Sequence, residues 1–217
     1  KDNKPAAYSK DNIPYTPKKF IPVSLAGYKE GDFAMIMGNP GRTSRYLTSW
    51  GISERMNAGN QARIIVRGVK QDVWRSFMRN DEAINIAYAS KYAGSSNYWK
   101  NSIGMNKALE KLKIIDRKKE LEKTFADWVK ADAARQDKYG KVLPTIEKNY
   151  ALKFEGTRTL DFIREAMMNG AEIQTIANKI VNIAEKNPAK DSLLTEVAAL
   201  YKDYYQKVDM ATMKAML

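Results

Sequence analysis

The sequence contains no cysteine and no histidine among its 217 residues. Their absence excludes a disulfide scaffold, a zinc finger and any other metal site built on thiolate or imidazole ligands. It also excludes a Ser-His-Asp or Cys-His catalytic centre contained within this chain. No apolar run approaches the roughly 18 residues that a membrane-spanning helix needs. We therefore expect no metal, no cofactor and no membrane span.

Proline is scarce after residue 40, because five of the seven prolines lie in the first forty residues. Proline at that density disfavours helix and favours extended or turn structure. Residues 33–37 form an apolar run between two turn signals, which is typical of a buried strand. Residues 20–25 predict a weaker strand, which Pro22 would place at a sheet edge. Residues 1–50 are therefore predicted to be extended, with one or two strands.

From about residue 54 onward the apolar residues recur at helical spacing. Residues 171–186 carry four isoleucines on one face, and Asp191 is predicted to cap a following helix that reaches Val208. Further helices are predicted around residues 64–77, 104–116, 121–129, 142–150 and 160–167. The predicted fold class is mainly α: a helical bundle of six to eight helices over residues 51–217, after a short N-terminal β/extended segment.

The net charge is +12, from 37 basic and 25 acidic side chains, and basic residues are not clustered. The densest basic stretch, Arg117-Lys118-Lys119, is followed directly by Glu120 and Glu122. A nucleic-acid-binding face is expected to be a concentrated basic patch with few acids in it. The distribution therefore favours ordinary solvated helix faces and predicts no nucleic-acid partner.

Residues 88–106 stand out because they are rich in aromatic, amide and hydroxyl side chains and carry only two full charges. Surface helices usually carry more charge, and a buried amide needs a hydrogen-bond partner because an unsatisfied one costs about 1–3 kcal/mol. Asn97, Asn101 and Asn106 therefore either connect helices to one another or face a polar ligand. Composition favours the first interpretation and leaves the second open.

Three stretches of the sequence resemble one family of enzymes. Residues 31–41 are similar to the apolar strand and Gly-Asn-Pro turn that follow the catalytic-aspartate strand in trypsin-like serine peptidases. Residues 41–50 and 95–106, the latter beginning Ser-Ser-Asn-Tyr-Trp, closely resemble the bacterial exported dipeptidyl-peptidases seven and eleven. The resemblance covers essentially the whole chain.

This resemblance implies a chymotrypsin-like double β-barrel interrupted by a large helical domain that caps the cleft. Residues 1–50 would be the tail of the first barrel half, and residues 51–217 the helical cap domain. The family's catalytic His and Asp precede the region that matches Lys1, and its catalytic Ser follows the helical domain. We therefore expect a fragment that holds no catalytic residue and is inactive alone. The sequence after Met213 also reads like an interrupted helix.

The resemblance also implies one binding residue. The family binds the free amino terminus of its substrate through polar groups that include an Asn of the helical domain, and the Ser-Ser-Asn-Tyr-Trp motif places this Asn at Asn97. Tyr98 and Trp99 are expected to pack behind it. The implied partners are peptides with a free N-terminus. The implied location is the periplasm or cell surface of a Gram-negative bacterium, and the resemblance leaves a homodimeric parent open.

The leading hypothesis is thus a fragment of a serine dipeptidyl-peptidase that releases N-terminal dipeptides from peptides. The alternative is a non-catalytic helical binding module for peptide or nucleic acid, and a purely structural helical domain is a third possibility. The residues that select the side chain before the cleaved bond are expected in the second barrel, outside this chain.

Overall fold

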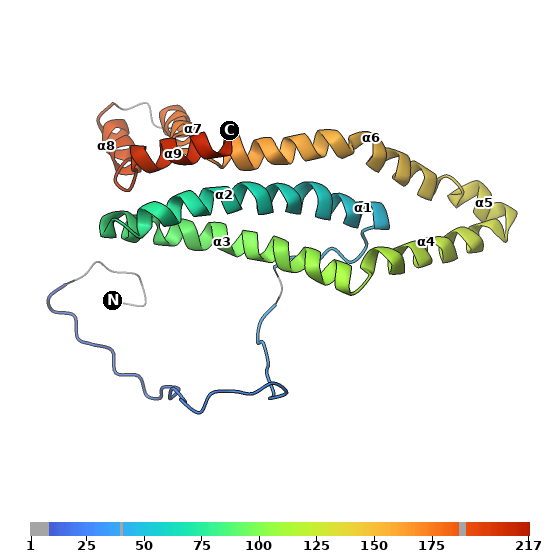
Figure 1. The fold of residues 1–217 in the computed structure, drawn as a ribbon, viewed down its shortest axis with the longest axis horizontal. Helices are drawn as coiled ribbons and strands as arrows, with labels where there is room; N and C mark the ends of the chain where they lie inside the picture. The colour runs from blue at the N-terminus through green and yellow to red at the C-terminus, as the bar shows by residue number, and fades with distance from the viewer. Residues whose placement is uncertain (1–8, 40, 187–189) are drawn as a thin grey trace. The chain divides into compact units, whose positions relative to one another are not determined.

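The computed structural model describes residues 9–39, 41–186 and 190–217, which divide into two units after Thr43 (Figure 1). The described residues of the first unit are extended and form neither helix nor strand. The apolar side chains of the predicted strands are exposed, as in Phe33 at 89% and Ile36 at 96%. The strands predicted at residues 20–25 and 33–37 are therefore not formed here. A strand requires a neighbouring strand to complete its hydrogen bonds, and the described residues supply none.

The second unit, from Ser44 onward, is helical in its described residues, which confirms the predicted fold class. Its elements follow one another as α1 (Ser49–Glu54), η1 (Arg55–Asn60), α2 (Gln61–Met78), α3 (Glu82–Lys111), α4 (Ile114–Lys130), α5 (Ala133–Tyr139), α6 (Val142–Ile163), η2 (Arg164–Met168), α7 (Glu172–Lys186), α8 (Lys190–Leu200) and α9 (Gln206–Met216). The two η elements are π-helical segments, each continuous with the helix beside it.

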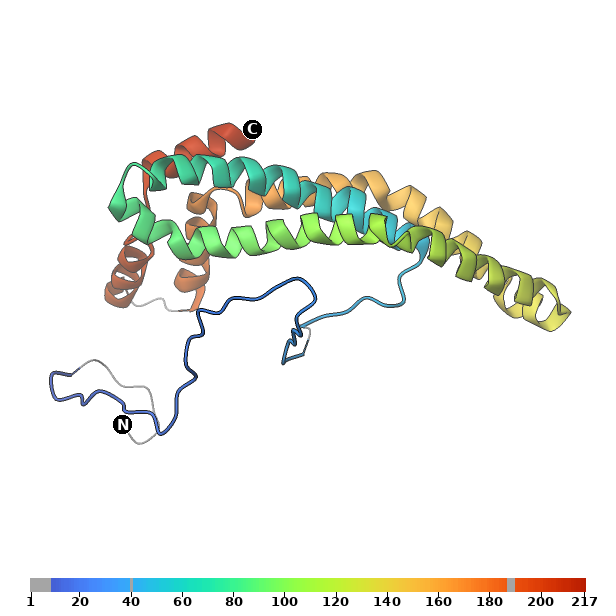
Figure 2. The ribbon, with the colours of Figure 1, turned by 60° about the horizontal axis from the view of Figure 1, so that its bottom comes forward.

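Helix α2 is the centre of this unit. It packs along α3 on one side and against α6 and α9 on the other (Figures 1 and 2). Among the helices of the described residues, none is long and apolar enough to cross a membrane. Whether residues 1–50 belong to a barrel and residues 51–217 to a cap remains a prediction. Helix α1 begins at Ser49, two residues before the predicted boundary.

Short polar residues begin several of the helices. The Thr48 hydroxyl accepts a hydrogen bond from the Gly51 amide, the Asp81 carboxylate from the Ile84 amide, and the Asp132 carboxylate from the Arg135 amide. Such N-caps satisfy backbone donors that have no partner inside the helix, each for about 1 kcal/mol.

The helix predicted over residues 104–116 is wrong. Helix α3 ends at Lys111, and Lys113 adopts a left-handed conformation with φ of 50°. This conformation breaks the helical hydrogen bonding and turns the chain, so that α4 packs against α1 as well as α3.

Two further helix boundaries differ from the predictions. The helices predicted at residues 142–150 and 160–167 are one continuous helix, α6, which passes into η2. The helix predicted from Asp191 to Val208 is interrupted between α8 and α9, and Asp191 lies inside α8 rather than before it. The interruption has a packing cause, because it lets Tyr205 and Val208 join the core.

The core lies where α2, α3 and α9 meet. Its buried residues are Trp74, Ile84, Tyr88 and Val208. The rings of Trp74 and Tyr88 pack edge to face, with centroids 5.3 Å apart at 78°. This cluster holds the N-terminal half of α3 against α2, and so positions the segment around residue 97.

Candidate functional site

Asn97 lies in the middle of α3, and its side chain is exposed. Among the described residues, no group forms a hydrogen bond with the Asn97 amide. Its carbonyl oxygen and its two N–H donors are therefore available to solvent or to a ligand. An amide of this kind can accept a hydrogen bond from an ammonium group and can donate to a carbonyl.

Apart from the exposed Lys100, the face of α3 around Asn97 carries several small or uncharged exposed residues. They are Ser90, Ala93, Gly94, Asn97, Asn101 and Gly104, which recur at helical spacing. A side chain added at Gly94 or Gly104 would meet nothing within 4 Å. Because the side chains at these positions are short, a peptide backbone can approach α3 closely there.

The structure distinguishes the roles of the three asparagines, Asn97, Asn101 and Asn106, for which the sequence left the same two alternatives. Asn106 connects helices: its Oδ1 accepts a hydrogen bond from Asn60 Nδ2 at 2.7 Å, and its Nδ2 lies 3.4 Å from the Met56 carbonyl. Asn97 and Asn101 are exposed and have no such role among the described residues. The helix-connecting interpretation therefore holds for Asn106, whereas the other two amides remain candidates for ligand contact.

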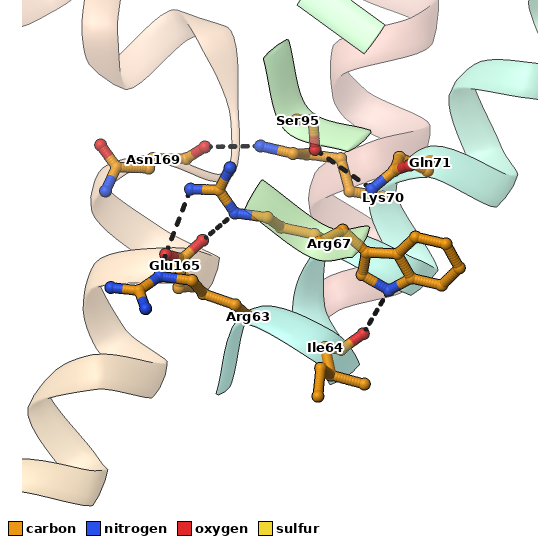
Figure 3. Close-up of polar contacts among 9 residues, drawn as sticks. Arg63, Ile64, Arg67, Lys70, Gln71, Ser95, Glu165 and Asn169 are labelled. Carbon is orange, nitrogen blue, oxygen red and sulfur yellow. Dashed lines mark hydrogen bonds and ion pairs between the residues drawn. The ribbon is translucent and has the colours of Figure 1, made fainter. Parts of the chain in front are cut away.

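The opposite face of α3 packs on α2 through polar contacts. Trp99 Nε1 donates to the Ile64 carbonyl at 3.0 Å, and Gln71 Nε2 donates to Ser95 Oγ at 3.3 Å (Figure 3). Trp99 thus packs on α2, on the far side of α3 from Asn97. Tyr98 is 57% exposed and lies beside Arg67, whose guanidinium is 5.0 Å from the ring centroid.

A buried charge cluster joins α2 to η2 next to this packing. Glu165 Oε2 accepts a hydrogen bond from Arg67 Nε at 2.7 Å, and Glu165 Oε1 accepts one from Arg67 Nη2 at 3.2 Å and lies 3.4 Å from Arg63 Nε (Figure 3). The Glu165 side chain is 9% exposed. The two guanidiniums compensate the negative charge of the buried carboxylate and satisfy its oxygens, so we assign this cluster a structural role.

Lys70 extends the same cluster toward η2. Its Nζ donates to the Asn169 carbonyl at 2.8 Å and lies 5.0 Å from the centroid of the Trp74 ring. Burial, and secondarily the Arg67 charge, lower the pKa of Lys70 to about 8. Sequence reasoning missed Lys70 and Glu165. The sequence shows basic residues at helical spacing along α2. Their acidic partner could not be predicted from it, because Glu165 lies 98 residues beyond Arg67 in the chain.

A cavity of about 370 Å³ opens beside Lys70, lined also by Trp74, Lys91 and Glu172. Lys91 Nζ already pairs with Glu172 Oε2 at 2.5 Å and donates to the Asp203 carbonyl at 2.7 Å. Lys91 and Glu172 of this cavity are thus paired with each other. Within the described residues, no group of three or more acidic side chains could hold a metal ion.

A family model described as Peptidase S46 matches residues 1–217. The chain is 44% identical over 216 residues to dipeptidyl-peptidase 7 of Porphyromonas gingivalis, covering 100% of this chain and 30% of that protein. It is 39% identical over 218 residues to an Asp/Glu-specific dipeptidyl-peptidase of Flavobacterium psychrophilum, covering 96% of this chain and 30% of the relative.

Among solved structures, the chain is similar to Porphyromonas endodontalis DPP11 in complex with the dipeptide Arg-Glu. The TM-score is 0.68 at 30% sequence identity, over 100% of this chain and 32% of that one. The chain thus spans about 30% of the length of the curated relatives it matches.

Proposed function

Since this chain belongs to the peptidase S46 family, we propose that it is part of a serine dipeptidyl-peptidase that releases dipeptides from the free amino ends of peptides. The observation that carries the proposal is the match of 100% of the chain to a dipeptidyl-peptidase 7 and of 96% of the chain to an Asp/Glu-specific dipeptidyl-peptidase. The likeness to DPP11 in complex with a dipeptide supports a peptide substrate. The catalytic triad lies outside this chain, whose residues include no histidine.

The helical unit caps the cleft of the parent enzyme and contributes Asn97 to the binding of the substrate's amino terminus. An enzyme that removes two residues at a time must measure length from the free amino end, and a fixed anchor for the ammonium does so. An amide oxygen accepts a hydrogen bond from the ammonium without the desolvation cost of a further carboxylate. The exposure and free hydrogen-bonding groups of Asn97 support this role.

The resemblance supports two further parts of the proposal. Residues 1–50 form the tail of the first barrel half, where strands of the parent protein would pair with residues 20–25 and 33–37. The parent enzyme works in the periplasm or at the cell surface, where peptides from outside the cell are available.

The test is Asn97→Ala in the full-length peptidase, assayed with dipeptidyl chromogenic amides. A hydrogen bond to a charged group contributes about 1.5–3 kcal/mol. Its loss lowers kcat/KM roughly 10- to 150-fold. The melting temperature stays close to that of the wild type, because the exposed Asn97 side chain supports no other described residue.

Asn101→Ala is the matched control, since Asn101 is an exposed amide one turn farther along α3. It should retain more of kcat/KM than Asn97→Ala does. A second comparison uses N-acetylated substrate: the preference for a free amino group shrinks in Asn97→Ala if Asn97 binds the ammonium. A folded Asn97→Ala enzyme with wild-type kcat/KM would refute the role of Asn97 as an anchor.

A further inference from the structure

The face of α3 that packs on α2 carries polar or aromatic residues at nearly every turn. They are separated alternately by four and three positions, at Tyr88, Tyr92, Ser95, Trp99, Ser102 and Asn106. These 18 positions in five steps average 3.6 residues, the period of an α-helix, so the six side chains lie along one face of α3. We name these six residues the α3 seam.

Four members of the α3 seam bond in one antiparallel register, three of them to α2 and Asn106 to Asn60, the last residue of η1, which continues directly into α2. Going along α3, Tyr92 accepts from Arg75, Ser95 from Gln71 at 3.3 Å, Trp99 donates to Ile64 at 3.0 Å, and Asn106 accepts from Asn60 at 2.7 Å. The position on α2 falls steadily as the position on α3 rises. The contacts therefore describe a single alignment of the two helices over four turns.

A polar seam specifies an alignment more strictly than an apolar one. Leucines can repack after a slip of one turn, but a slip here separates every donor from its acceptor. Each buried donor or acceptor left without a partner costs about 1–3 kcal/mol. A single polar residue in a helix seam is enough to select one register in coiled coils. The α3 seam therefore opposes both sliding and rotation of α3 on α2.

The orientation of α3 decides where Asn97 points. Successive residues of an α-helix are turned by about 100°, so Asn97 projects about 180° from the mean direction of Ser95 and Trp99. Ser95 lies two positions before Asn97 in the sequence, and Trp99 lies two positions after it. A rotation of α3 by the step of one residue would turn the amide well away from this direction.

We propose that Trp99 and Gln71 are positioning residues that set the direction in which α3 presents Asn97 to the substrate's amino terminus. The proposal rests on the proposed function of Asn97 and extends it to a second layer of residues. Trp99 acts through its N–H on the Ile64 carbonyl, and Gln71 through Ser95. Neither residue is required to touch the substrate.

The test is Trp99→Phe in the full-length peptidase, which keeps an aromatic ring in the seam but removes the N–H donor together with part of the ring volume. We expect KM for dipeptidyl amides with a free amino group to rise about 3- to 10-fold, with kcat within a factor of two. The effect should vanish in the Asn97→Ala background, because Trp99 acts through Asn97. A purely structural loss of folded enzyme would instead lower the apparent kcat in both backgrounds.

Tyr92→Phe is the matched control, since it also removes a polar group from an aromatic seam residue. Its contact with Arg75 is exposed and lies five residues from Asn97. Tyr92→Phe should leave KM unchanged. An equal rise in KM in Tyr92→Phe, or a Trp99→Phe effect that persists in the Asn97→Ala background, would overturn the positioning role.

A separate measurement distinguishes failure of this inference from failure of the proposed function. Spin labels at introduced cysteines, Asp72→Cys on α2 and Lys100→Cys on α3, report the alignment of the helices without any substrate; both sites are exposed. The double variant Trp99→Phe/Gln71→Leu should broaden the distance distribution, and Tyr92→Phe should not. An unchanged distribution refutes the seam inference, whereas unchanged kinetics in Asn97→Ala refute the anchor itself.

Discussion

Replacing Lys70 with methionine tests the buried charge cluster directly. Lys70 is only 6% exposed, although a lysine is almost never buried unless it is well paired. Its Nζ donates to one carbonyl, that of Asn169, and lies over the Trp74 ring. Methionine has a similar length and removes the charge, so Lys70→Met isolates the cost of keeping an ammonium at this place.

The magnitude follows from the surroundings of Lys70. Burial and the neighbouring Arg67 outweigh the carboxylates of Glu165, Glu172 and Asp209, and lower the pKa of Lys70 from 10.5 to about 8. That difference corresponds to about 3 kcal/mol by which the charged form is disfavoured in the folded protein.

The sign of the pH dependence is set by which state binds more protons. Below pH 8 both the folded and the unfolded chain carry the Lys70 proton, so the full cost of the buried charge is present. Between pH 8 and 10.5 the folded chain releases the proton and the unfolded chain keeps it. Stability therefore rises with pH through this window.

The assay is urea unfolding of the chain and of Lys70→Met at a series of pH values from about 7 to about 10. Subtracting the two curves cancels the other titrating groups. Over this range, the free energy of unfolding of the wild type should rise by about 2–3 kcal/mol relative to that of Lys70→Met. Ile65→Met, on the exposed side of the same helix, controls for the introduced methionine and should parallel the wild type. Parallel curves for Lys70→Met and wild type would refute the reasoning.

Glycine substitutions and truncations test the helical unit further. Gly156→Ala in α6 should raise the free energy of unfolding by up to about 1 kcal/mol, because its new methyl group meets nothing within 4 Å. Gly170→Ala should lower it by about 1–3 kcal/mol or more, because its methyl group would lie 1.8 Å from the Ala166 carbonyl oxygen. Among truncations monitored by circular dichroism, 44–217 should melt like the whole chain; 54–217 should melt lower, since it loses α1. The packing described would be contradicted if Gly170→Ala were more stable than Gly156→Ala, or if 54–217 melted at a higher temperature than 44–217.

The helices were predictable because their signals are local. Apolar spacing over residues 64–77 and 171–186 correctly predicted α2 and α7. The predictions failed at Lys113 and between α8 and α9, where the apolar spacing continues across a break. Each break allows the chain to contact another helix, and the spacing of apolar residues within a segment does not predict such contacts.

The candidate site was predictable only in part. The Ser-Ser-Asn-Tyr-Trp motif singled out Asn97 through its resemblance, whereas composition alone could not separate it from Asn106. The packing of α3 on α2 makes that separation: Asn106 lies in the seam and Asn97 lies outside it. The residues that hold α3 in place are ordinary in the sequence, so no motif identifies them.

By itself, the sequence determined the family, the mainly helical fold and the absence of histidine chemistry within the chain. These follow from residue identity and from spacing within a few turns. Only the tertiary structure decided which amides are exposed, which charges are buried and which way α3 faces. Those properties depend on pairs such as Arg67 and Glu165, which are 98 residues apart. Burying such a pair costs the desolvation of both partners, and their mutual attraction and hydrogen bonds offset that cost only when the fold brings them together. The local sequence around either residue does not contain this information.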